Sequence, residues 1–196
     1  MPFVFKRLAL LMSITAALAA DKQQAFHAPA AASMAYHQTV AQVTIGAETY
    51  AAGDKVRAAF GRLVPYDYGV LPVLVVIQND SRESIRLDQM NAEYVIPRGG
   101  RVTATPPGEV RYAHPPHRPD LGAAPPMPIP IKKKNPLGAW EIEGRALAAQ
   151  MVAPGLAASG FLYFQTQLQN GATIYLSGLT EARSGKELFY FEIPVE

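Results

Sequence analysis

The chain has 196 residues, of which 49% are hydrophobic, and its mean hydropathy is close to zero. This length suits one domain with a substantial core, and this composition excludes a protein with several membrane spans. A formal net charge of only +2 gives no electrostatic basis for binding nucleic acid.

The first nineteen residues have the pattern of a secretory signal peptide. Lys6 and Arg7 precede an apolar run from Leu8 to Leu18, which is shorter than the roughly 20 residues of a membrane span. Ala17-Leu18-Ala19 matches a cleavage site, so we predict that residues 1–19 are removed and that the protein is periplasmic or extracellular. The remaining chain has 16 basic and 16 acidic residues. We therefore expect no nucleic-acid partner and no stable membrane anchor.

The sequence contains no Cys, although an exported protein resides where disulfides can form. The fold must therefore be held by its core alone. The same absence excludes thiol catalysis, zinc–thiolate sites and a lipid anchor on Cys.

The rest of the fold is expected to be organised around Val73–Ile77. This stretch is apolar at both parities, which predicts a strand buried on both faces. Pro72 cannot donate to a sheet, so the paired part should begin at Val73. The following strand, 85–96, changes its apolar parity, and this predicts a bulge or corner near Asp88-Gln89.

The other expected elements follow from turn signals and periodicity. Residues 20–38 are Ala-rich without periodicity, which indicates a disordered leader before a single domain over 39–196. That domain should begin with a strand over 39–50 and a short helix over 54–60, with Asp54 as N-cap. A hairpin at 98–100 should lead into a returning strand over 101–105. After the insertion we expect a helix over 137–151 and closing strands over 158–165, 173–177 and 187–195. About seven short strands separated by turns predict a mainly β fold, an antiparallel β-sandwich with one or two short helices.

Residues 106–136 form a long insertion that contains ten of the seventeen prolines. Such long connections in a compact domain are usually functional or disordered, so we expect the contact surface here. His114 and His117 could offer two imidazoles, but no carboxylate cluster completes a metal site, and we predict no metal and no cofactor.

Motifs for hydrolases, zinc proteases, dinucleotide binding and calcium loops are missing from the sequence. Glu141 and Glu143 would point apart on a helix, so they do not form an acid–base pair. Trp140 is expected in the core. Tyr66, Tyr68 and Tyr112 fall in loops and are candidate binding residues together with His114 and His117, because Tyr is enriched where proteins touch.

Three stretches carry a resemblance to a known group of proteins. They are the apolar strand with its Asn-Asp turn (69–80), the Pro-Gly element that leads into Ser159-Gly160-Phe161-Leu162-Tyr163-Phe164, and the hairpin with Ser-Gly-Lys (176–191). Over about 70–196 the chain resembles uncharacterised exported bacterial proteins with an immunoglobulin-like β-sandwich. The resemblance implies export and fold and supplies no catalytic residues; members are often lipid-anchored, and the missing Cys departs from that pattern.

Three functions remain open from the sequence. The first is a non-enzymatic binding or structural module of the bacterial cell envelope, with another envelope protein as partner. The second is an exported hydrolase or metal-dependent enzyme on the same scaffold. The third is a chaperone-like or inhibitor module that pairs through a sheet edge, which Pro194 and the terminal charge of the last strand disfavour.

Overall fold

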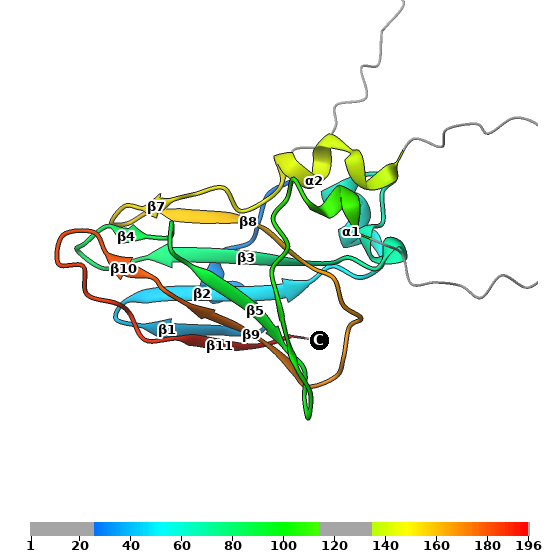
Figure 1. The fold of residues 1–196 in the computed structure, drawn as a ribbon. Coiled ribbons are helices and arrows are strands. Elements are labelled where there is room, and N and C mark those ends of the chain that lie inside the picture. The colour runs from blue at the N-terminus through cyan, green and yellow to red at the C-terminus, as the bar shows by residue number, and fades with distance from the viewer. Residues whose placement is uncertain (1–25, 114–134, 196) are drawn as a thin grey trace, which may run out of the picture.

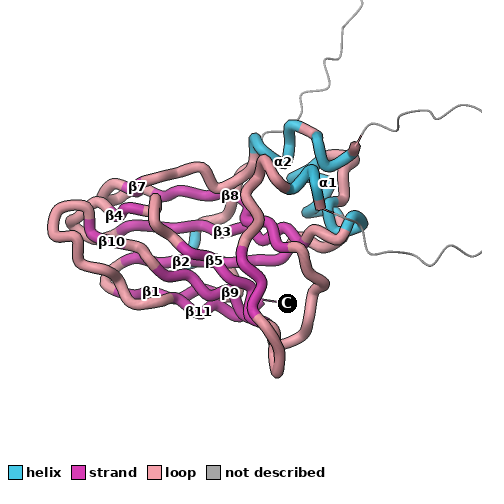
Figure 2. Tube along the Cα trace, in the orientation of Figure 1, coloured by secondary structure: helices cyan, strands magenta, loops and turns pink. Residues whose placement is uncertain are grey.

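The computed structural model describes residues 26–113 and 135–195. Within these residues the chain forms two facing antiparallel sheets and a small third sheet, with most of the short helices gathered at one end (Figures 1 and 2). The first sheet runs in the order β1 (His37–Val40), β2 (Val43–Thr49), β3 (Leu71–Asn79) and β8 (Ala157–Phe164). The facing sheet runs in the order β11 (Phe191–Val195), β9 (Ala172–Ser177), β5 (Asn91–Val95) and β6 (Arg101–Thr103).

The small sheet consists of β10 (Thr180–Glu181), β4 (Ile85–Arg86) and β7 (Met151–Val152). It lies at the end of the sandwich away from the helices (Figure 1). The helices are α1 (Asp54–Phe60), α2 (Trp140–Gly144) and four 3-10 helices, η1 (Ala31–Ser33), η2 (Pro65–Tyr68), η3 (Val110–Tyr112) and η4 (Pro136–Gly138). The predicted β-sandwich with few helices is confirmed, although the described residues contain eleven strands instead of about seven.

β3 is the central strand because both of its faces are covered. Leu71, Val73, Val75 and Ile77 enter an inner core between the two large sheets. Leu74 and Val76 enter an outer core on the other face of the first sheet, under α1, α2 and the N-terminal segment. All of these side chains are buried, which confirms the prediction of a strand covered on both faces.

Pro72 was expected to precede the paired part of β3, but it belongs to the strand and pairs with β8. β3 begins at Leu71, and Pro72 lies opposite Tyr163 in β8 while its carbonyl accepts a hydrogen bond from Tyr50 N–H. Only the pairing with β2 begins at Val73, opposite Thr49. The proline is tolerated because its carbonyl remains available for pairing although its nitrogen cannot donate.

The predicted corner near Asp88-Gln89 is confirmed. β4 belongs to the small sheet and β5 to the large facing sheet, and the chain turns between them, with Met90 N–H donating to the Leu87 carbonyl. The hairpin at 98–100 is also confirmed, since β5 and β6 pair across it from Val95 and Arg101 onward.

The disordered leader predicted over 20–38 is wrong from residue 26 onward. Ala31 and Met34 are buried in the outer core, and β1 begins at His37. Gly46 permits this close packing, because a Cβ there would lie 2.5 Å from Met34 Sδ and 2.9 Å from the Ala31 carbonyl oxygen. The sequence did not predict this burial, because the Ala-rich segment around Ala31 and Met34 shows no apolar periodicity.

The strand predicted over 39–50 is in fact a hairpin. Ala41 and Gln42 have φ angles of 48° and 63°, and the chain reverses there between β1 and β2. Two consecutive positive φ angles suit a tight hairpin turn, which Gly or Asn usually occupies. The turn was missed because neither residue is a turn former.

The helix predicted over 137–151 is also too long. Helix α2 ends at Gly144, and Leu147 N–H then donates to the Phe161 carbonyl beside β8. The last strand begins at Phe191 instead of 187, and Phe189 is exposed. In both cases hydrogen bonding to a neighbouring segment determined the boundary, which local periodicity does not report.

Candidate functional site

The helices α1, η2, η3, η4 and α2 form one structure at the end of the first sheet, which we call the cap (Figures 1 and 2). Val56, Ala59 and Phe60 of α1 and Ile142 of α2 are buried in the outer core below it. Tyr163 of β8 donates a hydrogen bond of 2.7 Å to the Ile142 carbonyl, which attaches α2 to the sheet. The cap is therefore a packed part of the fold that can hold surface side chains in place.

The described parts of the Pro-rich insertion belong to this cap. Residues 106–113 lead into η3, where Val110 is fully buried, and Asn135 begins η4 by accepting a hydrogen bond from Leu137 N–H. Asn135 Nδ2 donates to the Arg111 carbonyl, and Arg111 forms an ion pair with Glu143 of α2. The two chain ends that border residues 114–134 are therefore held together.

The predicted binding tyrosines have different positions. Tyr66 links η2 to the loop after β8, because its hydroxyl donates to Gln167 Oε1 at 3.0 Å and accepts from Leu168 N–H at 3.1 Å. Tyr68 lines a concavity of the cap, and Tyr112 on η3 is 70% exposed. His114 and His117 lie outside the described residues.

Trp140 was expected in the core but is 59% exposed at the start of α2. A Cβ at Gly144 would lie 2.8 Å from Trp140 Cε3, so the indole lies against its own helix where only glycine leaves room. This leaves the other indole face open to solvent. A Trp four residues before a Gly in a short helical segment was the sequence signal for this arrangement.

Two concavities flank Pro136 on the cap. One, of about 670 Å³, is lined by Asn135, Pro136, Gly138, Ala139, Trp140 and Glu141. The other, of about 260 Å³, is lined by Arg62, Leu63, Val64, Asp67, Tyr68 and Pro136. The shared proline makes them neighbours, with Trp140 in the lining of the first and Tyr68 in the lining of the second. We call this region, together with Tyr112, the cap surface.

The strongly shifted tyrosines belong to the cores. Burial raises the pKa of Tyr163 well above its usual range, and burial together with the nearby Glu48 carboxylate raises the pKa of Tyr50 to about 12. Burial also raises the pKa of Tyr94, whose hydroxyl accepts from Gln169 N–H. These groups stay protonated at neutral pH and act as packing and hydrogen-bonding residues.

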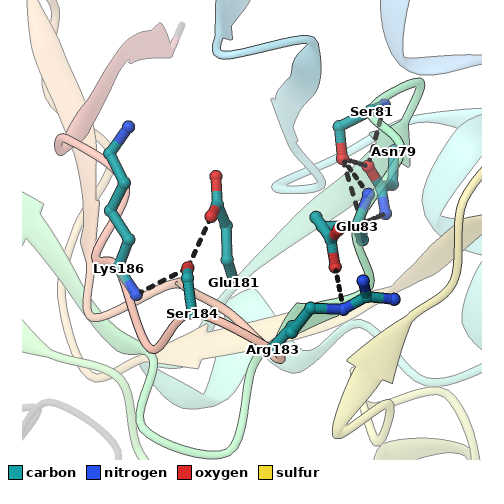
Figure 3. A network of polar contacts seen from close by, with 7 residues as sticks. All are labelled: Asn79, Ser81, Glu83, Glu181, Arg183, Ser184 and Lys186. Atoms are coloured by element: carbon teal, nitrogen blue, oxygen red, sulfur yellow. Dashed lines mark hydrogen bonds and ion pairs between the residues drawn. The ribbon is translucent and has the colours of Figure 1, made fainter.

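The opposite end of the sandwich carries a polar network (Figure 3). Asn79 is fully buried there, and its Nδ2 donates to the carbonyls of Glu83 and Val152, while its Oδ1 accepts from the N–H and hydroxyl of Ser81. The Glu83 carboxylate pairs with Arg183 at 3.4 Å. These contacts account for how the 80–84 loop is built and leave its asparagine without free hydrogen-bonding groups.

The described residues also bear on metal binding and on membrane spans. Within 26–113 and 135–195, no three His, Cys, Asp or Glu side chains gather as a metal site would require. No helix of the described chain is long and apolar enough to cross a membrane. The free edge of β11 faces β1, where Glu192 N–H donates to Gln38 Oε1 at 2.6 Å.

Comparison with known proteins identifies no family. No family model matches the chain, and no curated protein matches it. Among solved structures, the Bacillus subtilis protein ycdA, a proposed lipoprotein, aligns with 81% of this chain and 38% of its own at 11% identity and a TM-score of 0.37. The chain thus spans well under half of that protein, and a likeness of this size carries no argument about function.

Proposed function

We propose that the protein is a non-enzymatic, exported binding module of the bacterial cell envelope, and that its cap surface contacts another envelope protein. The carrying observation is the exposure of Trp140 and Tyr112 on one packed cap. Large aromatic side chains at the surface are uncommon, and Trp and Tyr are enriched among the residues that dominate binding energy. The signal-peptide pattern of residues 1–19 supports export.

The geometry of the cap also favours binding. The indole of Trp140 is held against Gly144 and presents one flat face, so little side-chain entropy is lost when a partner covers it. The neighbouring concavities around Pro136 can receive side chains of a partner. Glu141, Asp67 and Arg62 have no ion pair among the described residues, so the rim offers charged groups of both signs to a partner.

Site-specific photo-cross-linking in the living bacterium tests this proposal. A photoreactive residue at position 112 or 140 should capture the same envelope protein, whereas the same residue at position 57, on the exposed side of α1, should not. With that partner purified, the combined Trp140→Ala and Tyr112→Ala substitutions should weaken binding at least tenfold. Equal capture at all three positions, or undiminished binding by the double variant, would contradict the proposal.

A deletion separates the fold from the insertion. Replacing residues 114–134 by a short Gly-Ser linker should leave the thermal melt nearly unchanged, because Asn135 and Arg111 already hold the two ends together. Removing 108–134 should cost about 2–3 kcal/mol, since it also removes the buried Val110. A collapse of the fold after the shorter deletion would show that 114–134 is structural.

A further inference from the structure

The two large sheets differ in what covers their outer faces. The first sheet is covered by the N-terminal segment and the cap, which form the outer core. The outward side chains of β5, β9 and β11 are instead exposed or half-exposed, in strict alternation with buried ones. In Figure 1 the helices α1 and α2 stand at one end of the sandwich and do not extend over β9. The facing sheet thus presents a broad open surface.

Planar side chains form a ladder across this surface. The register places Tyr175 between Glu93 on β5 and Glu192 on β11. Arg101 on the edge strand β6 reaches diagonally over β5, with its Nη1 2.8 Å from Glu93 Oε2 and its guanidinium 5.0 Å from the Tyr175 ring centroid. The Tyr190 ring stacks on Tyr175 at 5.3 Å with an interplanar angle of 25°. The ladder therefore runs from guanidinium to phenol to phenol.

The end of this ladder is available to a ligand. Tyr190 is 51% exposed, and its neighbour Phe189 is exposed as well. The Glu192 carboxylate forms no ion pair within the described chain, although it lies beside Tyr175. An exposed ring face and a carboxylate with free lone pairs consequently lie on one side of the same sheet.

The remaining outward groups are uncharged and mostly polar, with Val95 and Pro194 as the apolar members. The register brings hydroxyl and amide side chains onto this face, namely Asn91, Thr103, Thr173 and Ser177. The face has two carboxylates and one guanidinium, and Glu93 already occupies the guanidinium. Among the described residues of this face a polyanion would find no free cation, and a lipid or apolar partner would have to desolvate many polar groups.

We propose that this face binds a neutral, linear glycan that crosses the strands. Sugar rings have apolar C–H faces that stack on aromatic rings, and their hydroxyl groups need carboxylate, amide and hydroxyl partners. The Tyr190 ring provides the stacking face, Glu192 accepts from sugar hydroxyls, and the Arg101–Glu93 pair fixes the far end of the platform. Four strands about 4.8 Å apart span roughly 14 Å, which accommodates a few sugar rings.

Calorimetric titration of the full chain with cellohexaose, chitohexaose and maltohexaose tests this proposal, with polygalacturonate as the anionic comparison. At least one neutral hexaose should bind saturably. Tyr190→Ala should weaken that binding at least tenfold and Glu192→Gln several-fold, whereas Tyr112→Ala on the cap should leave it unchanged. Because Glu192 is exposed, the second variant retains the fold even where loss of Tyr190 disturbs β11.

Three results would overturn the glycan site. They are no saturable binding of any neutral hexaose, binding that the Tyr190 and Glu192 variants leave intact, and stronger binding of polygalacturonate. Light scattering on a sizing column provides a further outcome: a dimer that Tyr190→Ala dissociates would assign the face to a second copy of the chain. The cap proposal depends on other residues, so its failure and the failure of this one are distinguishable.

Discussion

Replacing Asn79 by Ala removes the side chain that organises the end of the sandwich opposite the cap (Figure 3). Asn79 is fully buried and takes part in four side-chain hydrogen bonds, to the carbonyls of Glu83 and Val152 and from the N–H and hydroxyl of Ser81. Alanine keeps the backbone bonds with Leu156 and Gly155, since these use only the main chain. The substitution therefore isolates the amide group.

The expected loss follows from these four bonds. A hydrogen bond contributes about 1 kcal/mol net, and groups left buried without a partner cost more. The Ser81 hydroxyl and the Glu83 carbonyl each lose one bond to Asn79 but keep a partner, because the hydroxyl also donates to that carbonyl. These two losses therefore cost less free energy than the other two. We therefore expect the free energy of unfolding to fall by about 3 kcal/mol, which lowers the melting temperature by about 6–12 °C in a chain of this length.

Urea unfolding and calorimetry of the two proteins measure this loss. Asp80→Ala is the matched control, because Asp80 is the next residue, is exposed, and its side chain accepts a hydrogen bond from Gln78 of the described chain. The control should change stability by no more than about 0.5 kcal/mol. If Asn79→Ala costs no more than the control, the asparagine does not hold the loop and the assignment of its four bonds is wrong.

Three further predictions test other parts of the structure. Gly160→Ala should cost about 3 kcal/mol or more in urea unfolding, because the new Cβ would lie 2.4 Å from the Leu147 backbone; Gly108→Ala, which meets open space, should be nearly neutral. Acrylamide should quench the single Trp almost as well in the native as in the unfolded protein, since Trp140 is 59% exposed; strong native protection would refute its position. Burial raises the pKa of Tyr163 in the folded state, so the stability that its protonated hydroxyl contributes is present below pH 10 and is lost as the pH rises above that value. Tyr163→Phe should therefore cost about 1–2 kcal/mol at pH 8, where the bond to Ile142 is lost, and the difference from the natural protein should narrow between pH 10 and 11; a constant difference would contradict this linkage.

Several features of the fold could be predicted because they depend on neighbouring residues alone. The run Val73–Ile77 is apolar at both parities, so as a strand it removes its side chains from water only when both of its faces are covered. Its side chains are buried in both cores. The change of parity between Leu87 and Met90 requires the chain to turn, since strand side chains alternate strictly. The strand passes from one sheet to another at that point.

Other features depend on segments that are distant in the sequence. Ala31 and Met34 are buried only because Gly46 leaves room above β2. Likewise, the 145–147 segment leaves the helix because Gly160 lets its backbone approach β8, where Phe161 N–H donates to the Arg145 carbonyl. A glycine in a strand shows that something approaches closely but does not identify the approaching segment.

The candidate sites divide in the same way. The loop positions of Tyr68 and Tyr112 followed from local turn signals, and both lie on the cap. Tyr66 looked equivalent in sequence, but only the fold brings Gln167 and Leu168 to its hydroxyl. Exposure of Trp140 and the ladder of Arg101, Tyr175 and Tyr190 were decided by tertiary structure, because each requires knowing which elements remain uncovered. The sequence by itself determined the doubly covered strand β3, the corner after β4 and the hairpin at 98–100, because these depend on neighbouring residues. The packing of the sheets and the cap determined the other boundaries and which side chains a partner can reach.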